Sequence, residues 1–392
     1  MKRFIDGVVV LELGTFITGP YAGQLLAELG ASVIKVERPE GGDPFRDFSS
    51  GGYSPQFRAY NRGKRSLAID LNKAEGRQAI LRLLERCDVV LDNFRPGVME
   101  RLGLGWEMLH QRFPRLIQCS ITGFGADGPY KDRPAYDTVA LAMSGLASQI
   151  VDPERPLIPG PALADSITGL YTALGVTAAL AERATTGCGR RIEISMVEVM
   201  IAFTADPFAN FFETGRTMGP YDRVARSQSF ALKCADDRTI GIHLSSPAKF
   251  WLSLLAAIER PDLASDPRFA QREGRVANFV ALNDVLAAEL IRRPRAEWEQ
   301  RFTLHDVPHA PVYQLDEVVA DPQIKHLGTF YTLDHPQHGP VPAVHSPIWS
   351  DGERTGADLP PPMLGENTTE ILREAEFTDD EIAQLRGAGI IA

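Results

Sequence analysis

Asp165 is the residue whose type and position most directly suggest chemistry. It lies in the segment GPALADSITGLY, at the start of a long apolar stretch. An aspartate there could cap the following helix, because its side chain accepts hydrogen bonds from the N–H groups of the first turn. It could instead act as a nucleophile, since the neighbouring Gly and Ala leave room for a substrate. Spacing alone favours capping, and both hypotheses stay open at this point.

Arginines follow β-rich segments at two places in the chain. Arg38 comes directly after SVIKVE (32–37), and DNFRPG (92–97) contains Arg95 and precedes a helical stretch with Arg101. Ligands of parallel α/β sheets bind at the carboxyl ends of the strands. Each arginine alone is typical of a solvated surface, but the group together predicts a site for an anion.

Other catalytic and metal-binding patterns are missing from the sequence. It has no GxSxG elbow, no GxxxxGK[ST] phosphate loop and no HExxH pair. LGTFITGP stands where a dinucleotide site would carry GxGxxG, so a nicotinamide or flavin is not supported. His305 and His309, like His335 and His338, lack a third ligand, and the four cysteines form no CxxC pair. We therefore expect no metal.

Charge and composition narrow the class of partner and compartment. Among 392 residues, 41 Lys and Arg face 51 Asp and Glu, so the net charge is −10 and a nucleic-acid partner is not expected. The N-terminal segment MKRFIDGVVVLELG lacks a small-residue cleavage site, and the uncharged stretch 166–181 is short for a membrane span. We expect a cytoplasmic protein with no membrane contact.

Strand and helix patterns alternate through the first half of the chain, which predicts βαβ units around a parallel sheet. The expected strands cover 8–13, 32–37, 66–70, 88–93, 116–122 and 190–195, and the main expected helices cover 73–86, 163–185 and 196–213. The predicted fold class is α/β, with a large Rossmann-like domain and a smaller α+β domain.

The predicted domain limits follow from changes in pattern. The large domain spans 1–214 and is completed by a C-terminal return over 331–392, while the small domain spans 222–320. Linkers are expected at 215–221 and 321–345, where Gly, Pro and polar residues concentrate. The small domain combines two adjacent strands, SFALKCAD and RTIGIHL, with helices near 247–258, 278–291 and 295–304.

Five segments, taken in order, resemble one protein family. They are LGTFITGPYAGQLLAELGASVIKVERPEGGDPFR, NRGKRSLAIDL, DNFRPGVMERLGL, RPAYDTVALAMSG and ADSITG. Across almost the whole chain they resemble the family III CoA-transferases, the CaiB/BaiF group, which includes formyl-CoA:oxalate, carnitine and succinyl-CoA:dicarboxylate CoA-transferases. The later segments VPHAPVYQLDEVVADPQIKHLG and PPPMLGENTTEIL extend the resemblance towards the C-terminus.

The resemblance implies a fold, an assembly and a set of site residues. Two chains of the family thread through each other as an interlocked homodimer. Asp165 matches the family's nucleophile, a CoA thioester and a small carboxylic acid are the expected substrates, and no cofactor is tightly bound. The residues that the resemblance assigns to CoA binding are Arg38, Ile69, Asn93, Phe94, Arg95, Val98, Arg101, Tyr136 and Asp137.

The implied reaction transfers CoA through an aspartyl anhydride and an aspartyl-CoA thioester at Asp165. Two alternatives remain. The α-methylacyl-CoA racemases share the fold, but they use a histidine base at the position of Tyr136, whose ordinary pKa of about 10 does not suit that role. A catalytically silent CoA-binding subunit would lack the nucleophile, whereas Asp165 is present.

Substrate choice depends on fewer residues. Ile17 and Phe48 stand where the formyl-CoA:oxalate enzymes carry Gln and Trp, which argues against oxalate. The hypothesis is therefore succinyl-CoA as donor and a small dicarboxylic acid as acceptor. An arginine can clamp a carboxylate through two parallel hydrogen bonds. The candidates for such a clamp are Arg46, Arg65, Arg223 and Arg226.

Overall fold

The computed structural model describes residues 3–49 and 51–392, which divide into two compact units. The first unit runs as far as Ala147 and also takes in Gly160–Ala205 and Gly328–Ala392. The second holds Ser148–Pro159 and Asp206–Leu327. These limits differ from the predicted domains, because residues 148–159 and 206–214, predicted in the large domain, belong to the second unit, and residues 328–330 belong to the first.

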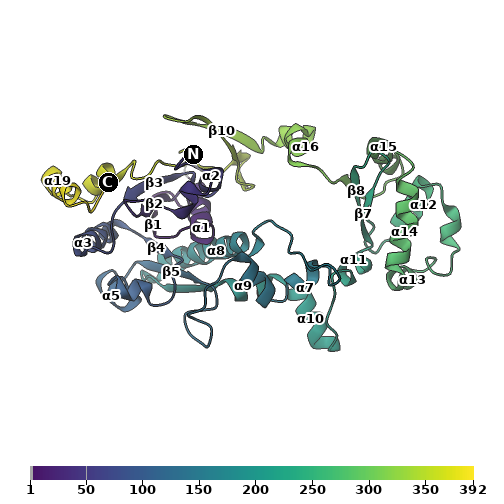
Figure 1. Ribbon diagram of the computed structural model, residues 1–392, viewed down its shortest axis with the longest axis horizontal. Coiled ribbons are helices and arrows are strands. Elements are labelled where there is room, and N and C mark those ends of the chain that lie inside the picture. The colour runs from purple at the N-terminus through teal and green to yellow at the C-terminus, as the bar shows by residue number, and fades with distance from the viewer. Residues whose placement is uncertain (1–2, 50) are drawn as a thin grey trace. The chain divides into compact units, whose positions relative to one another are not determined.

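Six parallel strands form the sheet of the first unit, in the order β3-β2-β1-β4-β5-β6 (Figure 1). They are β1 (Val9–Glu12), β2 (Ser32–Glu37), β3 (Lys64–Ala68), β4 (Val89–Asp92), β5 (Ile117–Thr122) and β6 (Arg191–Ser195). Each lies within or beside a segment that the sequence predicted as a strand. The predicted α/β class with a parallel sheet is confirmed.

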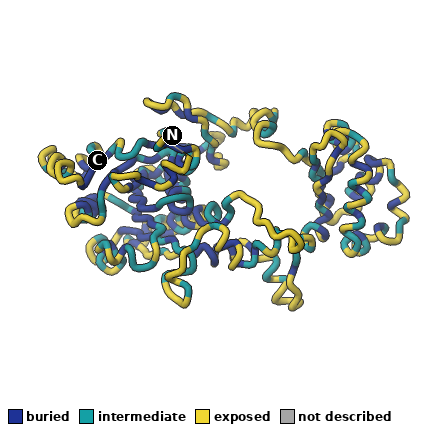
Figure 2. The backbone as a smooth tube through the Cα atoms, in the orientation of Figure 1, coloured by how far each residue is buried: buried dark blue, intermediate teal, exposed yellow. Residues whose placement is uncertain are grey.

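Both faces of this sheet are buried, and the burial follows the two-residue period of a strand. Val10 belongs to one hydrophobic core and its neighbour Leu11 to the other. Val89 and Leu91 point to the first core, whereas Val90 points to the second. The centre of the unit is accordingly dark blue in Figure 2. Helices must therefore cover the sheet on both sides.

The helices of the first unit form these two covering layers. One core takes side chains from α1 (Thr18–Glu28), α8 (Leu163–Thr186) and α9 (Met196–Phe203). The other takes them from α3 (Ala74–Leu83), α18 (Thr368–Glu374) and α19 (Asp379–Gly387), so the C-terminal return completes the unit. The remaining helices are α2 (Pro55–Asn61), α4 (Val98–Arg101), α5 (Trp106–Arg112) and α6 (Asp137–Met143), with short 3-10 turns η1 (Pro44–Asp47) and η2 (Leu84–Arg86).

The strand order reverses between β1 and β4. The chain leaves β1 towards β2 on one side, and from β3 it returns to β4 on the other side of β1. The connections that follow β1 and β4 therefore run in opposite directions from the carboxyl ends of these strands and leave a crevice between them. Ligands of open α/β sheets bind in such a crevice.

The second unit has a small antiparallel sheet with helices packed on it. Its strands, in the order β7-β8-β9, are β7 (Ser229–Lys233), β8 (Thr239–His243) and β9 (His309–Pro311). Its helices are α7 (Ala147–Ile150, which begins in the first unit), α10 (Ala205–Thr214), α11 (Asp222–Ser227), α12 (Ala248–Ala257), α13 (Arg272–Ala277), α14 (Phe279–Leu290), α15 (Arg295–Leu304), α16 (Leu315–Ala320) and α17 (Pro322–Leu327), with the 3-10 turn η3 (Pro261–Ala264).

Two segments differ from their predicted form. The helix expected over 196–213 ends at Phe203 and restarts as α10. Pro207 has no N–H to donate to the Phe203 carbonyl, and its ring would clash with that carbonyl in a continuous helix. The expected linker 321–345 contains α17 and a hairpin of β10 (Phe330–His335) and β11 (Gly339–Val344). Pro340 and Pro342 fit that hairpin because a two-stranded ribbon has open edges where a missing N–H is tolerated. A second, two-residue pair, β12 (Trp349–Ser350) and β13 (Glu353–Arg354), follows.

Helix α8 has the length and the apolar composition of a membrane span, and 39% of its most apolar window is buried. It packs against α1 and α9 and against the strands β5 and β6, as a core helix of the first unit. Leu170, Tyr171 and Leu174 nevertheless remain exposed on it.

Candidate active site

A pocket of about 200 Å³ opens at the point where the strand order reverses. Its wall comes from the loops after β1, β4 and β5, from a loop before α6 and from the start of α8. The lining residues are Thr15–Thr18, Asn93–Pro96, Ile121–Gly123, Lys131, Arg133–Tyr136, Asp165 and Met196. With Met196 at the start of α9, six loops or helix ends therefore converge on one small cavity.

Hydrogen bonds of Asn93 join the loop after β1 to the loop after β4. Its amide oxygen accepts from the Thr15 N–H at 3.0 Å, and its amide nitrogen donates to the Thr15 carbonyl at 2.8 Å and to the Thr18 hydroxyl at 2.9 Å. Gly14 and Gly19 close the same loop, since a Cβ on Gly14 would lie 3.0 Å from the Gly19 Cα. The pocket wall is thus fixed by polar contacts within the loops.

Asp165 does not cap α8. The N-cap is Ala162, which makes no side-chain cap bond, and Asp165 lies in the first turn with its carboxylate lining the pocket. Its own N–H donates to the Asp137 carboxylate at 3.1 Å. The capping hypothesis, which spacing alone favoured, is therefore wrong, because Asp137 from the neighbouring helix α6 satisfies that part of the first turn instead.

The electrostatic surroundings of Asp165 make its carboxylate unusually basic. Burial and, second, the negative charge of Asp137 raise the pKa of Asp165 to about 7. Among the described residues no lysine, arginine or histidine forms an ion pair with it. A carboxylate that is partly buried and has no cationic partner retains its nucleophilic lone pairs.

Three cations line the pocket that holds this carboxylate: Arg95, Lys131 and Arg133. Within the part of the chain that the structure describes, none of them forms an ion pair with an Asp or Glu, and the Arg133 guanidinium lies 3.7 Å from the centre of the Tyr130 ring. An acidic protein thus keeps three unneutralised cations around one cavity, which favours an anionic ligand.

The structure brings together some of the predicted CoA-binding residues and separates others. Asn93, Phe94, Arg95 and Tyr136 line the pocket with Asp165, and Asp137 lies behind it through its bond to the Asp165 N–H. Val98 and Arg101 lie on the short helix α4 that follows this wall but do not line the pocket. Two further residues lie outside it.

Arg38 is exposed at the end of β2. Ile69 is only 1% exposed, packs into the core, and its N–H donates to the Glu37 carbonyl at 2.8 Å. The Ile69 side chain is therefore held within the protein.

Two of the four arginines considered as a dicarboxylate clamp are occupied within the first unit, and Arg223 of the second unit forms an exposed ion pair with Asp206 at 3.5 Å. Arg46 is buried and forms two hydrogen bonds of 2.7 Å with the Glu37 carboxylate. Arg65 pairs with Glu370 and Glu374 of α18. The clamp hypothesis is wrong for these two, because their guanidinium groups already hold carboxylates of the protein. The other two, Arg223 and Arg226, lie on α11 of the second unit.

Several pocket residues were not identified from the sequence. Phe16 lines the wall beside Ile17, and Met196 begins α9 at its floor. Lys131 and Arg133 lie just before the segment around Tyr136, so a search for cations next to that motif would have found them. Phe16 left no such signal, because its role depends on a loop conformation that a pattern of residue types does not reveal.

Among the described residues, no group of three or more His, Cys, Asp or Glu side chains is placed to hold a metal ion. The polar groups of the pocket are one carboxylate, three cations, an amide, hydroxyls and backbone groups. Such a set can bind an anionic substrate and attack an electrophilic carbonyl.

The fold, the pocket and the comparison with known proteins agree on a family. CoA-transferase family III matches residues 5–368, and the chain belongs to that family. It is 32% identical over 99% of its length to the succinyl-CoA–D-citramalate CoA-transferase of Chloroflexus aurantiacus, of which it covers 98%. It is 31% identical over its whole length to a formyl-CoA:oxalate CoA-transferase of Rhodopseudomonas palustris, of which it covers 98%.

A solved structure shows the same architecture. The CaiB/BaiF family protein of Brucella suis superposes with a TM-score of 0.85, at 34% sequence identity, over 96% of this chain and 100% of that protein. The predicted family is confirmed.

Proposed function

We propose that the protein transfers CoA from a donor acyl-CoA, with succinyl-CoA as the preferred donor, to a small dicarboxylic acid, and that Asp165 is the nucleophile. The observation that carries this proposal is an unpaired, basic carboxylate in a pocket that also holds three unpaired cations. The cations suit an anionic substrate, and the carboxylate suits attack on its thioester.

The reaction proceeds by four balanced exchanges at Asp165. Its carboxylate attacks the donor thioester, which forms a mixed anhydride and releases CoA as a thiolate. The thiolate attacks the aspartyl carbonyl and gives an aspartyl-CoA thioester and the free donor acid. The acceptor carboxylate then attacks this thioester, and the released thiolate attacks the acceptor's carbonyl. New acyl-CoA leaves, and the Asp165 carboxylate is restored.

Other residues support these steps. The first turn of α1 begins at the pocket wall with no side-chain cap, so its N–H groups are the donors that we assign to the developing oxyanion. A pocket of about 200 Å³ suits a small acyl group, whereas the nucleotide of CoA must lie outside it. Arg38 and Arg101, which are outside the pocket, are the cations that we assign to the CoA phosphates.

Sequence identity does not separate succinate from oxalate, because relatives named for each are 31–32% identical to this chain. The lining supports the larger acid. Ile17 lines the pocket where oxalate enzymes carry Gln, so the protein lacks that polar group. Arg95, Lys131 and Arg133 provide charge for the second carboxylate of a longer dicarboxylic acid.

We propose that the working form is a cytoplasmic homodimer that needs only CoA thioesters and acids, with no bound cofactor. Leu170, Tyr171 and Leu174 of α8 support the dimer, since they expose apolar side chains on a core helix. Light scattering should give twice the chain mass for the wild type. A monomeric mass at micromolar concentration would contradict the dimer.

Mass spectrometry of acyl-CoA products tests the function. Purified protein is incubated with succinyl-CoA and a panel of mono- and dicarboxylic acids, and Asp165→Ala is the matched control. A new dicarboxylyl-CoA made by the wild type alone supports the proposal. New thioesters only from monocarboxylic acids would contradict the substrate class, and equal products from Asp165→Ala would exclude Asp165 as the nucleophile.

A further inference from the structure

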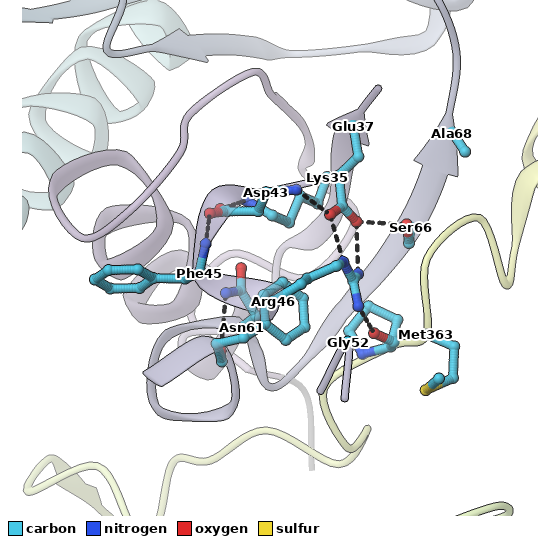
Figure 3. Close-up of polar contacts among 12 residues, drawn as sticks. Lys35, Glu37, Asp43, Phe45, Arg46, Gly52, Asn61, Ser66, Ala68 and Met363 are labelled. Carbon is cyan, nitrogen blue, oxygen red and sulfur yellow. Dashed lines mark hydrogen bonds and ion pairs between the residues drawn. The ribbon is translucent and has the colours of Figure 1, made fainter. Parts of the chain in front are cut away.

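Six charged side chains are buried beside the pocket, between β1, β2, β3 and the turn η1. Each is at most 5% exposed, and three acids balance three bases. They are Glu12, Lys35, Glu37, Asp43, Arg46 and Lys64. Figure 3 shows four of them: Lys35, Glu37, Asp43 and Arg46. Charges are costly to bury unless they are paired and hydrogen-bonded. None of them takes part in the reaction described above.

Lys35 is the link between the sheet and the loop that follows β2. Its ammonium group lies 2.8 Å from the Asp43 carboxylate and 3.1 Å from the Glu12 carboxylate, and it donates to the Gly14 carbonyl at 2.9 Å. Lys64 holds the other Glu12 oxygen at 2.7 Å. Asp43 is thereby fixed in position by a cation that is itself fixed to β1.

The second oxygen of Asp43 holds the backbone of the pocket wall. It accepts hydrogen bonds from the Phe16 N–H at 3.3 Å and from the Phe45 N–H at 2.9 Å. Phe16 has φ +63°, a left-handed backbone conformation that residues other than glycine rarely adopt. Such a conformation persists only where surrounding contacts enforce it. Asp43 supplies one of those contacts, and Asn93 supplies others at Thr15.

The Phe16 ring forms part of the wall of the pocket that contains Asp165. Its centre lies 5.3 Å from that of Phe45 and 6.2 Å from that of Tyr136, edge-on in both cases. Phe45 is the other residue whose N–H bonds to Asp43, so one carboxylate holds the backbones of both rings. A change in the backbone at Phe16 therefore changes the space in front of Asp165.

We propose that Asp43, fixed by Lys35, is a positioning residue that holds the Phe16 wall in its left-handed conformation and thereby determines which acids fit beside Asp165. The part that concerns acids rests on the proposed transferase function. The part that concerns the loop does not, and it can be tested by itself.

Amide hydrogen exchange of the loop over residues 13–19 tests the positioning role in Asp43→Asn, which keeps the size of the side chain and removes its charge. The new NH2 group must face either Lys35 or the two backbone N–H groups, so one of these contacts is lost whichever way the amide lies. Asp88→Asn is the matched control, because Asp88 also accepts from a backbone N–H, that of Val9 at 2.8 Å, and pairs with Arg183 at 2.8 Å, but does not line the pocket. We expect exchange in the loop to be about tenfold faster in Asp43→Asn only. Unchanged exchange, or the same increase in both variants, would overturn the proposal.

Kinetics with two acceptor acids of different width test the selectivity role. In Asp43→Asn the ratio of their kcat/KM values should change about tenfold, while CoA affinity stays within about twofold of the wild type. Asp88→Asn should leave the ratio unchanged. Equal losses for both acids would overturn the selectivity role. If the wild type transfers no CoA, the proposed function fails, while the exchange measurement still decides the positioning role.

Phe16→Gly keeps the proposal falsifiable if Asp43→Asn does not fold. Glycine adopts a positive φ without support, so this variant should fold and should shift the acid ratio by about tenfold through loss of the ring. Where Asp43→Asn also folds alone, combining it with Phe16→Gly should change the ratio less than about twofold relative to Phe16→Gly, because Asp43 acts through Phe16. Independent, additive effects of the two substitutions, or an unchanged ratio in Phe16→Gly, would overturn it.

Discussion

The carboxylates of Glu37 and Asp165 lie in the same unit, yet their pKa values move in opposite directions. Burial alone would raise the pKa of Glu37, but the Arg46 guanidinium, which donates two hydrogen bonds to it, outweighs burial and lowers that pKa. Asp165 is also partly buried, but its nearest charged influence is another carboxylate, Asp137, and its pKa rises to about 7. The difference lies in the partner, since burial acts on both groups.

This contrast separates charged residues that are paired within the fold from the pocket residues to which we assign the reaction. In the buried cluster, three acids face three bases, so each charge is neutralised where water is excluded. In the pocket, a carboxylate and three cations remain unpaired among the described residues, so they are free for a ligand. Unpaired charges cost stability, and the paired cluster beside them provides the rigid support that such a site needs.

Removing a charge from the paired cluster should have the largest effect on stability. Glu37→Gln leaves Arg46 charged and buried without its partner, so the free energy of unfolding should fall by about 3–5 kcal/mol in urea titrations. Glu370→Gln is the control, because Glu370 pairs with Arg65 at the surface and should cost less than about 1 kcal/mol. Similar, small losses in both would contradict the comparison.

Removing the charge of Asp165 in the pocket should instead raise the free energy of unfolding. In the folded protein the pKa of Asp165 is about 7, against an ordinary value of 3.8 in the unfolded chain. Between these pH values the folded state binds a proton that the unfolded state has lost, so the free energy of unfolding falls as pH rises. Asp165→Asn should therefore raise the free energy of unfolding by about 2–4 kcal/mol at pH 8. The gain should shrink towards acid pH and vanish below about pH 4. A loss of stability at pH 8 would contradict the account.

Catalysis should depend on pH in the same range. In the proposed mechanism Asp165 attacks only when ionised, so kcat/KM should fall about tenfold per pH unit below about pH 7 and level off above it. Asp137→Asn keeps an oxygen for the Asp165 N–H and removes the neighbouring charge, so the midpoint should move to lower pH. A midpoint that stays in place, or moves upward, would contradict the role of Asp137.

Removing one pocket cation should have the smallest effect of the changes considered, and the effect should be on KM. Lys131→Ala and Arg133→Ala should each raise KM by about tenfold and leave kcat within about threefold, because they bind the charge of the substrate and do not act on the reacting carbonyl. Arg112→Ala is the control, since Arg112 is an exposed arginine of the same unit that pairs with Glu85 outside the pocket. A selective fall in kcat would instead place either cation in the chemical step.

The sequence was most informative where structure is local. The strands follow from short runs of apolar and β-branched residues, and alternation with helices identified the parallel sheet. The apolar pattern over 196–213 hid the break after Phe203, although Pro207 cannot donate to the Phe203 carbonyl within a continuous helix. They also hid the β10–β11 hairpin, because its prolines are typical of extended, unpaired chain.

The candidate site was predictable only in part, for a reason that Arg46 illustrates. Its guanidinium made it a candidate clamp for a substrate carboxylate, but its partner Glu37 lies nine residues earlier and faces it only after β2 and η1 fold together. Whether a charged residue is free or neutralised depends on such tertiary partners. Asp165 was found through motifs that the family shares, whereas the roles of Phe16 and Asp43 arise from contacts across the fold.

Trapping the covalent intermediate tests the central claim most directly. The wild-type protein is mixed with succinyl-CoA, treated with hydroxylamine and digested, and the peptide that contains Asp165 is examined by mass spectrometry. An aspartyl-CoA thioester would be converted to a hydroxamate, so we expect that modification at Asp165 and only when the donor is present. Turnover without any modification of Asp165, or a hydroxamate on another carboxylate, would contradict the account.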